Sequence, residues 1–465
     1  MAAALSVEAA IWERELDVLM QRLGGCFARV ETRRTARDVV DGLLADLPRK
    51  NCWSLAEHAG HGSPDRIQHL LGRASWDHET VRAEVAAYAV ENLADGVEPD
   101  LVTLVFDETG DAKKGSCTVG VQRQYSGTCG RIENCQIAVF ATLATPAGHA
   151  FVDVELYLPR CWTSDPARRA AAGVPDDAEF ATKPQLALRM TDRVLAAGAG
   201  VGWIAADEAY GDNPELRREL EDRGLSYVMA VSCDTQIGVP KGKIRADELA
   251  ARLPASGWQI RSAGQGSKGE RLYAWAYTRL NDTTTGDTGD TGDKAESGPH
   301  RWLLIRRNPH TGELAYFLCH ATTAVPLATL VRVAGTRWRV EENFQAGKGC
   351  AGLDEHQVRT WTSWHRWTTL AMLAHAFLAV TAARARQSPT THTASTTPGD
   401  TEHQTTMIPL TCNEIRHLRA ALTRPIHDRQ HIARWSRFRR RHQHRARRCH
   451  YQARQQRDHD LRLWY

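Results

Sequence analysis

The sequence predicts an α/β protein in which a mixed sheet is flanked by helices, with helical segments at both ends of the chain. Three observations support this fold class. Residues 1–98 carry apolar side chains at helical spacing, strand-like runs and helices alternate from Leu101 onward, and residues 411–465 are basic with a helical pattern. The 465 residues, 42% of them hydrophobic, suffice for two or three domains around a sizeable core.

Residues 1–98 are predicted to form a helical N-terminal domain. Within it, residues 51–76 show the pattern helix, Gly/Ser/Pro turn, helix, with Pro64 near the start of the second helix. DNA-binding helix-turn-helix motifs share this pattern with ordinary helical pairs that have a polar face. In a helix-turn-helix, four side chains of the second helix would project into a DNA groove: Arg66, Gln68, His69 and Arg73.

Residues 99–237 and 326–385 are predicted to form an α/β domain. Four strand-like runs separated by Gly, Asn and Pro turns come first, followed by a helix, a further strand and a second helix. A long helix is predicted from Pro326 to Gly349. The apolar run 368–383 is short and contains His375, so we expect a buried helix there and no membrane span.

A strand-rich insertion, residues 238–325, separates the two parts of this domain. It contains a low-complexity polar loop, residues 281–300, and a Thr-rich linker, residues 386–410, precedes the C-terminal segment. The N-terminus lacks the pattern of a secretion signal, and the eleven cysteines form no C-x-x-C pair. We therefore expect a cytoplasmic protein with free thiols.

Charge is unevenly distributed along the chain, although the net value is only +4. Residues 411–465 contain fifteen arginines and four acids, a net charge of +11, which leaves −7 for the rest of the chain. A basic segment on an acidic body is typical of proteins that bind a polyanion, most often nucleic acid.

The C-terminal segment, residues 411–465, is predicted to bind DNA with little sequence specificity. Arginines neutralise phosphates, and aromatic rings between them can stack on exposed bases. The arginines proposed for this role are Arg437, Arg439, Arg440 and Arg441, and the aromatic residues are Trp435, Phe438 and Tyr451.

Two strands of the predicted sheet end on an aspartate, Asp107 and Asp207, and ligands of α/β proteins bind at strand ends. A third acidic position, Glu341 and Glu342, lies on the predicted long helix. Three carboxylates from two strand ends and a helix can hold two Mg²⁺ ions, which Mn²⁺ could replace. Two such ions would activate water and stabilise the leaving oxygen in phosphodiester cleavage.

The spacing on the long helix adds two cations to this site. Arg337 and Lys348 stand four residues before and seven residues after Glu341, which places all three on one helix face. A carboxylate beside two cations fits a bridging phosphate, but a surface ladder of ion pairs gives the same spacing.

Several blocks of the sequence resemble the DDE transposases of bacterial insertion sequences, which have an RNase H-like catalytic domain. The resemblance implies an RNase H-like mixed sheet flanked by helices, with residues 238–325 as an inserted β-rich subdomain. The blocks cover most of residues 100–380 and the C-terminal segment: VFDETGDAKKG, VGVQRQYSGTCGRIENCQIAVF, AADEAYGDN, GTRWRVEENFQAGKGCAGLDEHQVRTW and WSRFRRRHQHRARRCHYQ.

The resemblance also implies the catalytic and metal-binding residues. Asp107 matches the first aspartate of the family, after the first strand, Asp207 matches the second, after the fourth strand, and Glu341 matches the glutamate.

Many transposases of this branch also place a Tyr, an Arg and a Lys at −7, −4 and +7 from that glutamate. Arg337 and Lys348 fit this signature, whereas the tyrosine position holds Ala334. The departure puts the role of the tyrosine near the transposon end in doubt, and leaves the metal site unaffected.

Neighbouring acids are alternative ligands: Glu108, Asp111, Glu208 and Asp212. If the first strand continues past Asp107, the alternation of side chains points Glu108 away from it. Glu342 lies about 100° round the helix from Glu341, off the face shared with the two cations.

Further basic side chains are candidates for phosphate contacts. Lys113 and Lys114 follow the first aspartate and would lie against a DNA backbone, or in a solvated loop. Arg123 and Arg131 flank a predicted hairpin that could offer both to phosphate, although a plain hairpin is the simpler interpretation.

Taken with the resemblance, the sequence predicts a transposase that binds the terminal inverted repeats of an insertion element. It would nick DNA with Mg²⁺-activated water and join the freed 3′-hydroxyl to target DNA. The resemblance implies a dimer in the DNA complex and no membrane partner. The alternatives are a domesticated, non-catalytic DNA-binding protein and a nuclease of similar fold without strand transfer.

Overall fold

The computed structural model describes residues 2–239, 242–266, 269–280, 300–387, 408–423 and 425–462. The chain forms two compact units. Unit 1 consists of Met1–Trp76, Glu355–Gln357 and Arg416–Tyr465, and unit 2 of Asp77–Asp354 and Val358–Ile415. Most of the predicted polar loop and of the Thr-rich linker lies outside the described residues.

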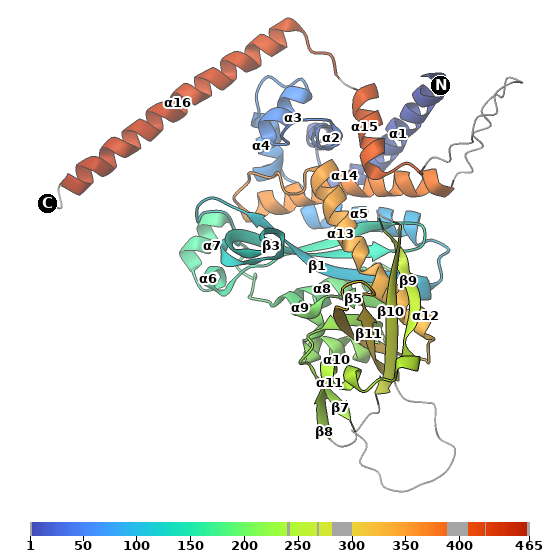
Figure 1. The fold of residues 1–465 in the computed structure, drawn as a ribbon. Coiled ribbons are helices and arrows are strands. Elements are labelled where there is room, and N and C mark those ends of the chain that lie inside the picture. The colour runs from blue at the N-terminus through green and yellow to red at the C-terminus, as the bar shows by residue number, and fades with distance from the viewer. Residues whose placement is uncertain are drawn as a thin grey trace, which may run out of the picture. The chain divides into compact units, whose positions relative to one another are not determined.

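Unit 2 is built on a ten-stranded sheet (Figure 1). Its strands follow the order β2-β3-β1-β5-β6-β12-β11-β10-β9, and β4 pairs with β3 beside β2. The strands are β1 (Thr103–Ala112), β2 (Gln122–Ser126), β3 (Arg131–Ala144), β4 (His149–Leu156), β5 (Trp203–Ala206), β6 (Ser226–Val231), β9 (Gln259–Gly266), β10 (Gly269–Leu280), β11 (His300–Arg307) and β12 (Leu314–Ala321).

The first half of this sheet confirms the predicted RNase H-like fold class. β3 runs antiparallel to β1, whereas β5 is parallel to β1 and β6 is parallel to β5. In the spatial order β4-β3-β1-β5-β6, the first strand along the chain, β1, therefore lies in the middle. β5, the fourth of these five strands along the chain, lies directly beside β1. β5 is buried along its whole length, as expected of a central parallel strand covered on both faces.

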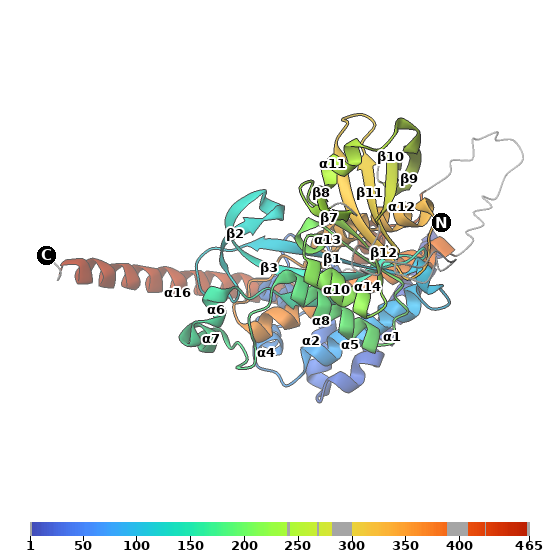
Figure 2. The ribbon, with the colours of Figure 1, turned by 90° about the horizontal axis from the view of Figure 1, so that it is seen from below.

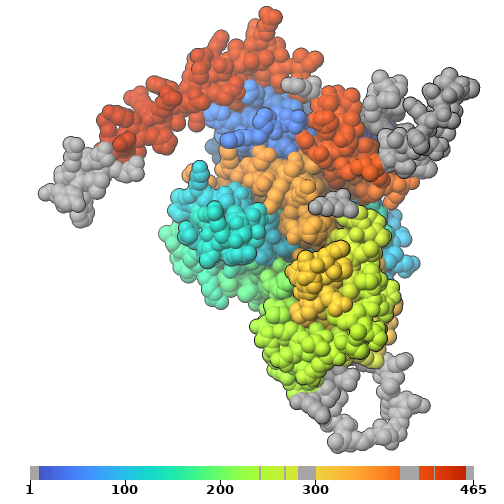
Figure 3. Space-filling model, viewed as in Figure 1, coloured from blue at the N-terminus to red at the C-terminus, as the bar shows by residue number. Residues whose placement is uncertain are grey.

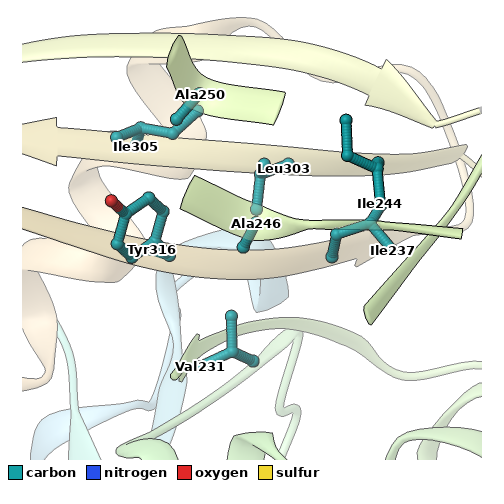
Figure 4. Close-up of a cluster of buried hydrophobic side chains, with 8 residues drawn as sticks. All are labelled: Val231, Ile237, Ile244, Ala246, Ala250, Leu303, Ile305 and Tyr316. Atoms are coloured by element: carbon teal, nitrogen blue, oxygen red, sulfur yellow. The ribbon is translucent and has the colours of Figure 1, made fainter. Parts of the chain in front are cut away.

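The strand-rich insertion does not form a separate sheet. β12, β11, β10 and β9 continue the central sheet beyond β6, each antiparallel to its neighbour. Among the described strands of the insertion, only the hairpin of β7 (Gln236–Val239) and β8 (Gly242–Arg245) pairs apart from it. Its side chains pack with both halves of the large sheet in one apolar cluster (Figure 4): Val231, Ile237, Ile244, Ala246, Ala250, Leu303, Ile305 and Tyr316.

Helices cover the sheet of unit 2. In chain order they are α5 (His78–Leu93), η2 (Pro99–Leu101), η3 (Gly127–Cys129), α6 (Arg160–Thr163), α7 (Pro166–Ala172), α8 (Lys183–Ala196), α9 (Glu208–Gly211), α10 (Pro214–Asp222), α11 (Ala246–Ala251), η4 (Ala255–Gly257), α12 (Leu327–Thr336), α13 (Trp338–Ala351) and α14 (Trp361–Gln387). α5 packs against β4 and α14, so the division between the units falls after Trp76 and earlier than residue 98, the end predicted for the helical domain.

The apolar helix α14 is buried, as the sequence predicts. In the described part of the chain it is the one helix long and apolar enough to span a membrane, but 89% of that stretch is buried. It packs against α5, α13 and β4. His375 is buried with it and lies 5.0 Å from Phe151, measured between ring centres.

Unit 1 joins the two ends of the chain. Its helices are α1 (Ala2–Arg22), η1 (Leu23–Cys26), α2 (Val30–Leu44), α3 (Cys52–His58), α4 (Asp65–Gly72), most of α15 (Cys412–Leu422) and α16 (Arg429–Arg462). α2, α3 and α4 pack on one another, and the predicted helix, turn, helix pattern is found in α3 and α4, with Pro64 at the N-cap position of α4.

Candidate functional site

Asp107 lies within β1 and not at its end. The sequence predicted that the strand stops there, but β1 pairs with β3 without interruption from Thr103 to Ala112. The Asp107 side chain is buried, and its Oδ2 atom accepts a hydrogen bond from Nη1 of Arg337 at 3.1 Å. Arg337, which the sequence placed near Glu341, therefore also contacts Asp107.

Asp207 directly follows β5, as predicted. Its Oδ1 atom accepts a hydrogen bond from the backbone N–H of Ala209 at 3.0 Å and so caps α9. The last residue pair between β1 and β5 is Val105 with Ala205. Because the two strands are parallel neighbours, Asp107 and Asp207 occupy equivalent positions, each two residues beyond this last pair.

The backbone approaches closely where α9 follows Asp207. A Cβ atom on Gly211 would lie 1.8 Å from the carbonyl oxygen of Ala230 on β6, which no side chain tolerates. Glycine at this position therefore lets α9 pack directly on β6 and holds the Asp207 cap in place.

Glu341 lies on α13, near enough to Asp107 for its charge to act on that carboxyl. The predicted long helix is broken at Arg337, where α12 ends and α13 begins, but Arg337 keeps helical dihedral angles. The spacing between Arg337 and Glu341 is therefore preserved across the break. The charges of these two residues have opposite effects on Asp107: the charge of Glu341 raises the pKa of that carboxyl, and the charge of Arg337 lowers it.

Glu342, the alternative to Glu341, is occupied elsewhere. Its Oε2 atom lies 2.6 Å from Nη1 of Arg339 and 3.1 Å from Nε2 of His149. Hydrogen bonds to these two cation-forming side chains outweigh burial and lower the pKa of Glu342 to about 2. These contacts favour Glu341 as the carboxylate available at the site.

Burial and neighbouring carboxylates disfavour the charged forms of both aspartates. Burial, followed by the charge of Asp207, raises the pKa of Asp107 to about 7. Burial, followed by the charge of Glu108, raises the pKa of Asp207 to about 6. Arg337 opposes both shifts but does not cancel them. A divalent cation is the ligand that such a set of oxygen donors fits best.

The carboxylates do not form a closed cage for a cation. In the part of the chain that the structure describes, no three or more His, Cys, Asp or Glu side chains are grouped as a metal site. Mg²⁺ usually keeps several waters and takes one or two carboxylates, so an open arrangement suits it. Asp107, Asp207 and Glu341 are the residues that would hold it.

Three side chains beside the aspartates interact in a way that the sequence did not reveal: Glu108, Tyr210 and Lys183. Glu108 accepts a hydrogen bond from the hydroxyl of Tyr210 at 2.9 Å and forms an ion pair with Lys183. Tyr210 is fully buried, three residues after Asp207. The motif around Asp207 could have suggested Tyr210, but Lys183, at the start of α8, gave no signal.

Two of the other alternative acids, Asp111 and Asp212, have partners of their own. Asp111 forms an ion pair with Lys113, and Asp212 accepts hydrogen bonds from Thr235 at 2.7 Å and from the backbone of Ser232 at 3.0 Å. Glu208 is exposed, and its charge contributes to the raised pKa of Asp207.

The predicted phosphate-binding lysines differ in their surroundings. The Lys348 ammonium lies 5.8 Å from the centre of the Phe344 ring, and its charge opposes the burial that raises the pKa of Asp111. Lys113 is engaged by Asp111, whereas Lys114 is exposed. Lys114 is thus better placed than Lys113 to meet a phosphate.

The predicted hairpin with Arg123 and Arg131 is formed by β2 and the first part of β3, at the edge of the large sheet (Figure 2). Both arginines are exposed, and Arg131 pairs with Glu133 on its own strand at 3.0 Å.

In unit 1, the side chains predicted to enter a DNA groove are all exposed on α4 or at its end: Arg66, Gln68, His69 and Arg73. The C-terminal arginines divide into two groups. Arg439 forms an ion pair with Glu57 of α3, whereas Arg437, Arg440 and Arg441 line a shallow groove with His444 and Arg445. From the groove to residue 456, almost all side chains of α16 are exposed, as the surface of this helix in Figure 3 shows.

Two of the three aromatic residues of the basic segment, Trp435 and Phe438, do not match their predicted role. Trp435 is fully buried and donates a hydrogen bond to the carbonyl of His61 at 2.8 Å. The Phe438 ring lies 5.1 Å from the Trp53 ring of α3. Both side chains therefore anchor α16 within unit 1 and are not free to stack on bases. Tyr451 remains exposed.

Two protein families match the chain. The DDE superfamily endonuclease family matches residues 22–251, and the transposase DDE domain family matches residues 177–377. The chain belongs to this DDE superfamily. The matches include Asp107 and Asp207 in the first case and Asp207 and Glu341 in the second.

Individual proteins are also similar to this chain. The probable transposase for insertion sequence element IS701 of Microchaete diplosiphon is 28% identical over 257 residues, which are 52% of this chain and 63% of that relative. The match thus spans less than two thirds of the relative. Among solved structures, piggyBac transposase in a cryo-EM synaptic complex with hairpin DNA aligns with a TM-score of 0.44 and 10% identity, covering 88% of this chain and 76% of that chain.

Proposed function

We propose that this chain is a transposase that binds the terminal inverted repeats of an insertion element and catalyses Mg²⁺-dependent cleavage and strand transfer of DNA. One observation carries the proposal. Asp107 and Asp207 occupy equivalent positions on two parallel neighbouring strands, and the charges of Asp207 and Glu341 both act on Asp107. The two family matches support the same reaction class.

The roles of the residues follow from their surroundings. Asp107, Asp207 and Glu341 would hold the divalent ions, with Mn²⁺ able to replace Mg²⁺. Bound there, the ions supply activated water and stabilise the leaving oxygen. Arg337 donates a hydrogen bond to Asp107 and partly balances the negative charge of that carboxylate. Lys348 and Lys114 would contact phosphates of the DNA strand.

The proposed DNA contacts of unit 1 divide into two kinds. α4 would read the terminal repeat with Arg66, Gln68 and Arg73, because base contacts in a groove carry sequence information. α16 would follow the phosphate backbone with the arginines of its open groove, a contact that is independent of sequence. Two copies of the chain would hold the two ends of the element in the DNA complex.

The experiment is a cleavage and joining assay on DNA that carries the element's own ends. Asp107→Asn, Asp207→Asn and Glu341→Gln should each abolish cleavage and leave end binding in gel shifts intact, because each removes a charge at nearly unchanged volume. Glu215→Gln, an exposed acid at the start of α10, is the matched control. Absence of cleavage by the wild type would favour a non-catalytic DNA-binding protein, and cleavage without joining would favour a nuclease.

A further inference from the structure

We propose that His149 is a positioning residue that fixes the rotation of α13 and thereby places Glu341 opposite the two aspartates. The proposal rests on the proposed function of Glu341. His149 is the first residue of β4, on the far side of β3 from β1. It was not singled out by its sequence pattern, and it has no contact with the aspartates among the described interactions.

Both ring nitrogens of His149 meet side chains of α13. Nδ1 donates to Oδ1 of Asn343 at 2.7 Å, and Nε2 lies 3.1 Å from Oε2 of Glu342. These two residues immediately follow Glu341. A single imidazole therefore binds two consecutive positions of the helix, which point in directions about 100° apart.

Asn343 extends the connection into the sheet. It is fully buried, and its Nδ2 atom donates to the hydroxyl of Thr142 on β3 at 3.1 Å. The amide thus has one partner on β4 and one on β3. Nη1 of Arg339 contacts the same oxygen of Glu342, Oε2, at 2.6 Å.

These hydrogen bonds fix the rotation of α13, which apolar packing of the same helix does not. The Phe344 ring packs against both Phe140 and Phe151, with ring centres 5.5 Å from each, and this contact holds α13 against the sheet. Apolar contacts are non-directional, so they tolerate a small rotation of the helix. Hydrogen bonds weaken steeply with angle, so the His149 and Asn343 bonds resist that rotation.

A small rotation matters because of the position of Glu341. The residue precedes the bound pair directly, so a turn of α13 moves its carboxylate sideways relative to Asp107. Displacement of a reacting group by about 1 Å can cost on the order of 100-fold in rate. The network therefore acts on the reaction without touching DNA or metal.

The first test uses His149→Ala and the matched control His320→Ala. His320 is a buried histidine on β12 of the same sheet, and its Nδ1 atom pairs with the carbonyl of Leu225. We expect His149→Ala to slow single-turnover cleavage at least tenfold and to raise the half-saturating Mg²⁺ concentration severalfold, with end binding in EDTA unchanged. His320→Ala should lower the melting temperature and keep both kinetic values. Equal kinetic losses in the two variants would overturn the proposal.

The second test uses conservative rescue at Thr142. Thr142→Val removes the oxygen that accepts from Asn343 at nearly constant volume, and should reproduce part of the His149→Ala defect. Thr142→Ser retains the hydroxyl and should cleave within about twofold of wild type. Loss of activity in Thr142→Ser to the level of Thr142→Val would show that packing, and not the hydrogen bond, is responsible.

A third measurement separates this inference from the proposed function. The rise in melting temperature on adding Mg²⁺ to the protein without DNA should be smaller in His149→Ala than in the wild type. If the wild type shows this rise but cleaves no DNA, the proposed function fails and the inference stands. If the rise is identical in both proteins, the inference fails whatever the DNA assay shows.

Discussion

Asp107 is a buried carboxyl whose charged form is disfavoured when no cation is bound. Burial and the charge of Asp207 raise its pKa to about 7, against an unfolded value near 3.9. A carboxyl with a raised pKa holds its proton longer in the folded state than in the unfolded state. Stability of the metal-free protein therefore falls as pH rises from about 4 to about 7.

We predict that Asp107→Asn stabilises the metal-free protein at pH 8 by roughly 1–3 kcal/mol, because the amide removes a buried charge. At pH 5, where Asp107 is mostly protonated, the gain should be close to zero. Urea unfolding of both proteins in EDTA at the two pH values measures it. A gain of equal size at both pH values would show that the charge is not its cause.

Lys348 presents the opposite case, a cation whose loss should leave the fold unaffected. Its ammonium contacts the Phe344 ring, and its charge interacts with the charge of Asp111. We predict that Lys348→Ala changes stability by at most about 0.5 kcal/mol, as for an exposed ion pair. Cleavage should slow about tenfold, which corresponds to about 1.4 kcal/mol of transition-state stabilisation. Melting curves and single-turnover rates measured together decide the outcome; lost stability with wild-type rates would make Lys348 a structural residue.

At the scale of the element, α9 is placed by the absence of a side chain. A Cβ atom on Gly211 would overlap the Ala230 carbonyl, so α9 or β6 would have to move. We predict that Gly211→Ala costs roughly 1–3 kcal/mol of stability, the usual cost of overpacking, and also reduces cleavage because the Asp207 cap shifts.

Gly349 on α13 is the matched control for this prediction. Nothing lies within 4 Å of a Cβ atom built there. Gly349→Ala should therefore stabilise the protein by about 0.5–1 kcal/mol, the difference between the two residues inside a helix. Thermal denaturation of both variants checks the pair, and a loss of stability in Gly349→Ala would mean that α13 needs its glycine for another reason.

The elements also show where sequence reasoning succeeds. Strands and helices with a clear apolar period were predicted correctly, including β5, α8 and the buried α14, because their burial is encoded locally. The end of β1 was misplaced because its last residues are polar and are held in the strand by pairing with β3, a contact remote in sequence. The break at Arg337 was missed for a similar reason, since helical spacing continues through it.

The candidate site could be proposed from the sequence to the extent that its residues lie at strand ends or at fixed helical spacing. Asp207, Glu341 and Arg337 meet that condition. The bonds of Glu108 to Tyr210 and Lys183, and of His149 to α13, depend on chain segments that only the folded sheet brings together. A single sequence contains no local pattern for them.

At the scale of the whole molecule, the basic C-terminal segment is a structural part of unit 1 as well as a polyelectrolyte. Trp435 is fully buried, and Arg419 of α15 is buried between Glu13 and Asp41. We predict that Trp435→Ala destabilises unit 1 by about 3–5 kcal/mol, as expected for truncating a buried tryptophan. Hydrogen exchange of α3 amides measures it; unchanged protection would mean that α16 is dispensable for the fold.

Charge can be removed from α16 without disturbing this anchor. Arg437, Arg440 and Arg441 line the open groove, whereas Arg439 is paired with Glu57. We predict that changing the three groove arginines to Gln keeps the melting temperature of the protein. It should reduce the slope of log affinity against log salt by about 2.7, or 0.9 for each lost phosphate contact. Binding titrations at several salt concentrations test this, and an unchanged slope would exclude the groove as a phosphate site.

The union of both chain ends in unit 1 has a consequence for biosynthesis. Glu57 and Arg439 are separated by 382 residues, so α3 leaves the ribosome long before its partner exists. At about 5–20 residues per second, translation takes about 20–80 s to cover that interval. During this time the Trp53 side chain and the surface that will receive Trp435 are exposed on the nascent chain. A message truncated before codon 429 would yield a polypeptide whose N-terminal helices never acquire this cover, a natural target for chaperones and proteases.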